Sequence, residues 1–251
     1  MSWPSNGGLV LPRNYSLQHY ERDETCVAVE ISPNVIASLE AWDRNPRAQG
    51  KKQEAIDYIK KVISSTPITD PVNLNLSQLD LNMLPPLDVF GDYLKEVDIS
   101  HNLLEDFPEE LESFRNLLSL DISHNRLEHL PESLIRCQRL TNLNLAHNTL
   151  RALPHNIGAL STLQELDVRS NQLESLPQTI GDLSELTSLI VPCNHLKELP
   201  SSMGNLKKLK IFYAQSNQLT TLPDDFFDIT DSSYANGATF RLSQSLGVEL
   251  A

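Results

Sequence analysis

The sequence predicts an α/β solenoid, in which stacked coils of chain form a curved parallel sheet with short helical segments on its convex side. Three observations support this prediction. Asparagine recurs at intervals of 23 residues, leucines hold fixed positions around each asparagine, and two amphipathic segments precede the first repeat. The six asparagines in phase are Asn102, Asn125, Asn148, Asn171, Asn194 and Asn217.

Each repeat places apolar residues where a strand and a turn need them. The fullest copy runs from Leu163 to Leu173 in the pattern L-x-x-L-x-L-x-x-N-x-L, and residues 166–168 alternate like a strand with one buried face. The sharp turn that follows leaves backbone groups inside the coil, away from water. An asparagine side chain both donates and accepts hydrogen bonds, so Asn171 can satisfy that backbone. We therefore expect the six asparagines to form a structural ladder between neighbouring coils.

The remainder of each repeat predicts the convex side. Between Leu153 and Leu160, apolar residues stand three and four apart, which favours an extended turn followed by a short helical or 3₁₀ segment. The frame and its period identify these units as leucine-rich repeats. They resemble the 23-residue class found in intracellular Ras-group leucine-rich-repeat proteins and in bacterial relatives.

The first 66 residues lack the repeat. Residues 1–30 are polar and aperiodic, and we expect a largely disordered leader, either a loose terminus or a non-cleaved export signal. Residues 31–66 predict a helical N-terminal cap. Ser32-Pro33 is a typical helix start, a Pro- and Gly-containing segment breaks the helix, and a second helix runs on to Ser65. Such a cap would cover the apolar edge of the first coil.

Residues 67–229 predict about seven to eight coils, and residues 230–251 predict a degenerate C-terminal cap or tail. In the first coil Leu79 takes the asparagine position, as expected for a coil that adjoins a cap. Continuing the count of 23 beyond Asn217 puts Phe240 at the next asparagine position, so the pattern fades there.

The N-terminal region carries a narrower resemblance. The residues concerned are Ala41-Trp42, Pro46, the segment from Gln53 to Ile56, Ile59, Val62, and the first coil from Leu74 to Pro85. They resemble the helical cap and first coil of the type III secreted leucine-rich-repeat effectors of bacteria (the IpaH, SlrP and YopM group). This resemblance implies a protein-binding effector. Many members of that group continue into a ubiquitin-ligase domain with a catalytic cysteine in a C-x-D motif, which none of the cysteines here matches.

The composition restricts the partners. A net charge of −13 and a pI near 4.9 argue against nucleic acid and anionic membranes, because both attract basic surfaces. No stretch reaches the roughly 18 apolar residues that span a bilayer, and the start of the chain lacks the pattern of a Sec signal. We expect a monomer that binds a protein, with no membrane insertion, no nucleic-acid partner and no cofactor.

Neither the cysteines nor the histidines predict catalysis or a metal site. Cys137 stands at a position that other repeats fill with leucine, so we expect it in the core. Cys193 lies beside the ladder without a base next to it, and together with Cys26 the three unpatterned cysteines fit a reducing compartment. Three histidines precede ladder asparagines and should stack as a solvated column rather than converge on a metal. They are His101, His124 and His147.

Residues at equal phase form columns on the concave face. The central column reads Asn75, Asp98, Asp121, Asn144, Asp167, Ile190 and Tyr213. Because it turns from acidic to apolar, we predict an apolar hot spot for a protein partner, with the acidic residues steering basic charge toward it. The predicted binding residues are Glu96, Asp98, Asp121, Glu165, Asp167, Arg169, Ile190, Pro192, Ile211 and Tyr213. Alternatively, the C-terminal tail covers the apolar end, with Phe240 or Leu246 over it.

The sequence therefore predicts a non-enzymatic protein-binding module. The cap resemblance favours a bacterial effector that reaches the host cytoplasm by a non-Sec route. One alternative is the substrate-recognition domain of a ubiquitin ligase whose catalytic domain is absent from this chain. The other is an intracellular, cytoplasmic scaffold of the Ras-group type.

Overall fold

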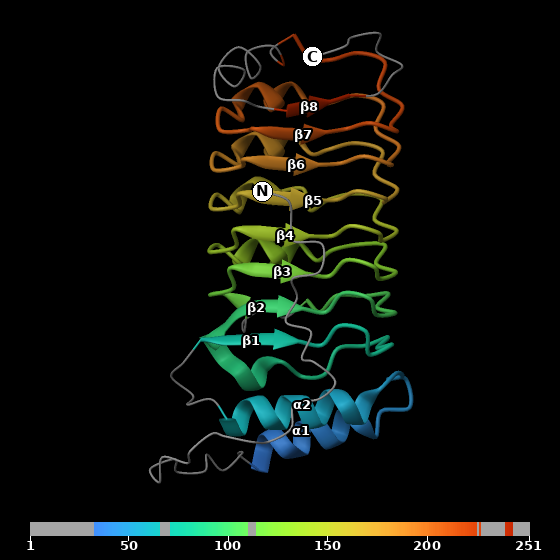
Figure 1. Cartoon of the computed structure of the whole chain (residues 1–251), viewed down its shortest axis with the longest axis vertical. Coiled ribbons are helices and arrows are strands. Elements are labelled where there is room, and N and C mark those ends of the chain that lie inside the picture. Colours follow the sequence, from blue (N-terminus) through green and yellow to red (C-terminus); the bar gives the residue numbers. More distant parts are fainter. Residues whose placement is uncertain (1–32, 66–70, 110–113, 225, 227–238, 243–251) are drawn as a thin grey trace, which may run out of the picture.

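The computed structural model describes residues 33–65, 71–109, 114–224, 226 and 239–242. The expected leader, residues 1–30, and with it Cys26, lies outside the described residues. Eight parallel strands form one sheet in the order of the chain, with two helices at its N-terminal end and 3₁₀ segments behind it (Figure 1). The predicted α/β leucine-rich-repeat solenoid with a helical cap is confirmed.

The elements follow the repeat. The helices are α1 (Pro33–Asp43) and α2 (Lys52–Ser65). The strands are β1 (Val72–Asn75), β2 (Leu94–Asp98), β3 (Ser119–Asp121), β4 (Asn142–Asn144), β5 (Glu165–Asp167), β6 (Ser188–Ile190), β7 (Ile211–Tyr213) and β8 (Thr239–Arg241). The 3₁₀ segments are η1 (Asp88–Tyr93), η3 (Glu132–Arg136), η4 (Ile157–Ala159), η5 (Gln178–Asp182) and η6 (Ser201–Asn205).

The two helices cover the N-terminal end of the solenoid, beside β1 (Figure 1). Ala55 and Ile59 of α2 and Leu39 of α1 are fully buried and join the same apolar cluster as the leucines of the coils. A bare first coil would expose that apolar edge to water, so the cap extends the core by burying it.

The loop between the helices fastens the cap to the first coil. Gly50 has φ +101°, and a Cβ there would lie 2.4 Å from the carbonyl oxygen of Asp80, so only glycine fits this close approach. The next residue, Lys51, donates its backbone N–H to the carbonyl of Leu79 at 2.7 Å. Asn82 accepts from the N–H of Gln49 at 2.6 Å through its side chain. The cap and the first coil are thus joined by backbone contacts as well as by apolar packing.

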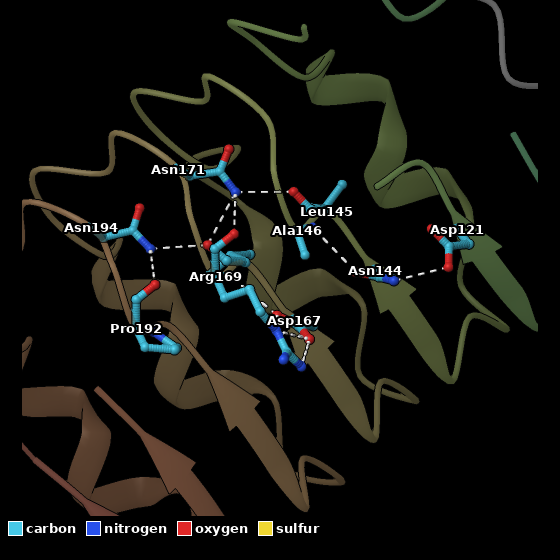
Figure 2. Close-up of polar contacts among 10 residues, drawn as sticks. Asp121, Asn144, Leu145, Ala146, Asp167, Arg169, Asn171, Pro192 and Asn194 are labelled. Atoms are coloured by element: carbon cyan, nitrogen blue, oxygen red, sulfur yellow. Dashed lines mark hydrogen bonds and ion pairs between the residues drawn. The ribbon is translucent and has the colours of Figure 1, made fainter. Parts of the chain in front are cut away.

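The ladder asparagines hydrogen-bond to backbone on two coils, as predicted. Asn148 accepts the N–H of Leu127 from the preceding coil at 3.1 Å. Its amide group donates to the carbonyls of Ile122 in that coil at 3.0 Å and of Leu145 in its own coil at 3.1 Å. Figure 2 shows the equivalent bonds of Asn171 and Asn194. Each asparagine therefore closes its own turn and ties it to the turn before.

The C-terminal end differs from the expected phase. Phe240 pairs in register with Phe212 at the centre of β8, a step of 28 residues instead of 23. Its ring packs against Phe212 and Phe226, with centroids 6.4 and 6.3 Å apart. The prediction that Phe240 stands at an asparagine position was wrong, because the last repeat is longer than the period that the count assumes.

Replacing Asn148 by leucine is expected to lower the free energy of unfolding strongly. The change leaves buried backbone donors and acceptors of two coils unpaired, at roughly 1–3 kcal/mol for each group. Chemical denaturation should show a total loss of about 2–5 kcal/mol. Gln172→Ala, an exposed change beside the next ladder asparagine, serves as the control and should be close to neutral. Equal stability of the two variants would refute the structural role of the ladder.

Candidate functional site

The concave face is built from residues that the sheet holds in strict register. Pairing of β4 with β5 aligns Asn144 with Asp167, and pairing of β6 with β7 aligns Ile190 with Tyr213. Neighbouring strands in a sheet lie about 4.8 Å apart, so each column is a straight row of side chains along the solenoid. The predicted columns are confirmed from β1 to β7, and β8 adds Arg241 beyond Tyr213.

Most of the central column also forms the turn that ends each strand. Asp98 accepts the backbone N–H of Ser100 at 2.9 Å, and Asp121 accepts that of Ser123 at 2.9 Å. The same bond, from a side-chain oxygen to the N–H two residues later, is made by Asn75, Asn144 and Asp167. Such local side-chain bonds favour Asn and Asp at turns. The Asn and Asp residues of the column therefore have a structural role before any role in binding.

The column changes character at β6. Ile190 has no oxygen with which to accept a backbone N–H, and the residue two positions later is Pro192, which has no N–H to satisfy. The two replacements compensate each other, so an apolar side chain enters the column at this coil without leaving an unpaired donor. Ile190 is in this way freed from the turn-forming role of its column.

Three side chains form what we call the apolar patch, namely Ile190, Ile211 and Tyr213. All three are partly exposed on the concave face. The guanidinium carbon of Arg241 lies 5.3 Å from the centroid of the Tyr213 ring, within the range of a cation–π contact. Phe240 does not cover the patch, because its side chain is in the core, and Leu246 lies outside the described residues.

Asp98 and Asp121, which we call the acidic pair, face each other from β2 and β3. Each receives a hydrogen bond from a neutral amide, Asp98 from Asn75 at 3.3 Å and Asp121 from Asn144 at 2.9 Å. Burial raises the pKa of Asp121, Asp98 adds to that rise, and hydrogen bonds from Ser123 and Asn144 oppose it. The pair keeps its negative charge at neutral pH without a cationic partner among the described residues.

Two of the predicted binding residues are less accessible than expected. Asp167 is only 4% exposed, because the guanidinium of Arg169 binds both of its carboxylate oxygens (Figure 2). The contact to Asp167 in turn raises the pKa of Arg169. Pro192 is buried, because its short ring lies at the turn between the longer side chains of its column neighbours, Arg169 and Gln215. Neither residue presents the surface to a partner that the sequence analysis assigned to it.

The remaining predicted residues lie on the accessible part of the concave face. Glu96 is exposed and accepts from Asn73 at 3.0 Å, and Glu165 is partly exposed and accepts from Asn142 at 3.0 Å. They flank the central column on the side opposite to Arg169. The structure thus places Glu96, Glu165, the acidic pair and the apolar patch on one continuous surface.

Sequence analysis missed Arg241, because the 23-residue count does not reach it. The signal was present in the segment Thr239-Phe240-Arg241, which repeats the polar–apolar–polar alternation of a strand.

The histidines stack as predicted. The ring centroids of His101 and His124 are 4.0 Å apart, and those of His124 and His147 are 4.1 Å apart, with nearly parallel planes. Each histidine has a positive φ of 54–56°. In the part of the chain that the structure describes, no group of three His, Cys, Asp or Glu residues is placed to hold a metal ion. Desolvation, followed by the neighbouring histidines, lowers the pKa of His124 from 6.5.

The cysteines are placed as the repeat predicts. Cys137 is fully buried in the leucine core, where burial raises the pKa of its thiol to about 12, so it stays protonated and unreactive. Cys193 is exposed.

Comparison with known families follows from this geometry. Residues 92–150 match a leucine-rich-repeat family model, and residues 138–217 match a leucine-rich-repeat region model. The chain is a leucine-rich-repeat protein. Its fold is that of a protein–protein interaction module, with a concave sheet as the extended surface. None of its described helices is long and apolar enough to cross a membrane.

Solved leucine-rich-repeat structures are similar at a distance. A leucine-rich-repeat protein of Leptospira interrogans is 29% identical over 58% of this chain and 37% of its own, with a TM-score of 0.55. YopM, described as a leucine-rich effector protein from Yersinia pestis, is 26% identical over 76% of this chain and 62% of its own, with a TM-score of 0.53.

The ectodomain of the Arabidopsis thaliana receptor kinase GASSHO1/SCHENGEN3 is 27% identical over 78% of this chain and 25% of its own, with a TM-score of 0.62. This leucine-rich-repeat protein therefore spans 25–62% of the length of the three structures. A search of curated proteins finds no match.

The leucine-rich-repeat protein is expected to lose stability in mild acid through His124. Because its folded-state pKa lies below 6.5, the unfolded chain binds a proton more readily. This contribution is complete above pH 6.5 and is lost as pH falls below that value. Denaturation at pH 7.5 and 5 should show a smaller pH effect in His124→Ser, a residue that Ser170 and Ser216 supply at the same position. An unchanged pH effect would contradict the coupling of the stack.

Proposed function

We propose that this leucine-rich-repeat protein binds a protein partner through its concave face and acts as an effector in the cytoplasm of a host cell. The observation that carries the proposal is the apolar patch, which stands where the turn-forming residues of the central column give way to Ile190 and Tyr213. The mechanism is display of a preformed surface, not catalysis.

Physical arguments favour this surface over the rest of the solenoid. The patch residues stand on strands that pair with both neighbours, so little freedom remains to be lost on association. Tyrosine is enriched among the residues that dominate binding energy, and apolar neighbours that exclude water strengthen that contribution. The acidic pair extends the surface and adds charge that steers a basic partner.

The effector role rests on the helical cap. The cap and first coil resemble those of secreted bacterial effectors, and YopM, which is described as an effector, is similar over 76% of this chain. A plant receptor is similar over a comparable share, so the repeats alone do not favour one role over another. The cap is what favours an effector over an intracellular scaffold. The same surface would equally serve as the substrate-recognition part of a ubiquitin ligase.

Capture from host-cell lysate tests the binding surface. The wild-type protein should enrich a specific partner, and the double variant Ile211→Ser/Tyr213→Ala should retain it at least about tenfold less, because hot-spot residues carry most of the binding energy. Ile211→Ser is safe for the fold, since Ser119 and Ser188 occupy the same column.

The matched control is Tyr93→Ala, which removes a tyrosine that is 37% exposed on η1, outside the concave columns. Equal loss in the control and the double variant, or no loss in either, would refute binding through the apolar patch.

Delivery into the host cytoplasm is tested with a reporter that becomes active only there. We expect transfer of the fused chain from bacteria with a type III system, and loss of transfer when residues 1–30 are removed, since non-Sec export of this kind reads an N-terminal leader. Circular dichroism of the shortened chain controls for folding. Transfer that is independent of the secretion system would overturn this part of the proposal.

A further inference from the structure

The charged side chains of the solenoid are partnered in two different ways. Off the concave face, basic residues pair with a glutamate of the preceding coil. These pairs are Arg151 with Glu128, Lys197 with Glu174 and Lys208 with Glu185. On the concave face the carboxylates of the acidic pair, Glu96 and Glu165 instead receive neutral asparagine amides.

This difference leaves the concave face with uncompensated negative charge. An amide satisfies a carboxylate oxygen by hydrogen bonding but does not neutralise it. Among the concave carboxylates that the structure describes, only Asp167 is bound by a cation, its neighbour Arg169. A partner that brings positive charge to Asp98 and Asp121 therefore gains an attraction that the protein itself does not supply.

The distance between the acidic pair and the apolar patch is set by the sheet. The pair stands on β2 and β3, and the patch on β6 and β7. Four strand spacings separate their midpoints, which amounts to about 19 Å. An extended chain advances about 3.3 Å per residue, so about six residues cover that distance.

The width of the surface also restricts the occupant. Strands β3 to β7 are three residues long, so the face is only about 10 Å wide across the columns. A strip of this width, running along the solenoid axis, matches one extended chain better than the face of a folded domain.

We propose that the concave face recognises an extended segment of the partner that carries a large apolar side chain and, about six residues away, basic residues. The apolar side chain contacts Ile190, Ile211 and Tyr213, and the basic residues contact Asp98 and Asp121. This inference rests on the proposed function and adds the chemical pattern of the segment that is bound.

Synthetic peptides test the pattern directly. The probes are fluorescein-labelled twelve-residue peptides of serine and alanine that contain one phenylalanine and an Arg-Arg pair, separated by six residues or by two, in both directions along the peptide. Fluorescence anisotropy at low salt should show tightest binding for one of the six-residue spacings. Binding of that peptide should weaken about tenfold when phenylalanine becomes serine or the arginines become glutamates, and should weaken with added salt.

Variants of the protein assign the two contacts. Asp98→Asn retains the acceptor for the turn, as Asn75 and Asn144 do in the same column, and removes one charge. We expect it and Tyr213→Ala to weaken the matched peptide about tenfold. The controls, Glu174→Gln for charge and Tyr93→Ala for an aromatic ring, should leave it unchanged.

Equal affinity at both spacings would overturn the two-point pattern. Failure of every peptide, while lysate capture still depends on Tyr213, would also overturn it but would leave the proposed function in place, with a folded surface as the occupant. If lysate capture is indifferent to Tyr213 as well, the proposed function fails together with this inference.

Discussion

The structure depends on a buried asparagine side chain that completes the backbone hydrogen bonds of two successive coils. Every coil leaves its sheet by a sharp turn whose N–H and carbonyl groups point inward, where water cannot reach them. At Asn171 the side chain accepts from Leu150 of the preceding coil and donates to Leu145 of that coil and to Val168 of its own. Because this constraint recurs at every turn, the strands above it fall into one register, and the columns of the concave face follow.

A second constraint acts on the surface itself. In the central column, Asn and Asp end each strand by accepting a backbone N–H, so much of what seems to be an acidic binding surface is first a set of turns. Function enters where that requirement is removed. At Ile190 and Pro192, the acceptor and the donor disappear together, and an apolar side chain becomes available to a partner. The structural requirement thus limits where binding residues can stand, and the exception to it shows where they do.

Much of this architecture could be predicted from the sequence, because the period is regular. Counting in steps of 23 predicted the ladder, the buried Cys137 and the register of the concave columns. The count failed at Phe240, since a longer final repeat is invisible to a fixed period, and Arg241 was missed with it. The burial of Asp167 was not predictable either, because it depends on the side chain of Arg169 folding back onto it. Such a contact lies within one coil and leaves no trace in the repeat.

The central claim is that the ladder holds the turns independently of what the concave columns carry. Amide hydrogen exchange at the N–H groups that donate to ladder asparagines tests it most directly. These include Leu127, Leu150 and Leu173. They should exchange as slowly as the strand amides, both in the wild type and in Ile211→Ser/Tyr213→Ala. Exchange at the rate of solvent-exposed turns in the wild type, or loss of protection in the concave variant, would contradict the account.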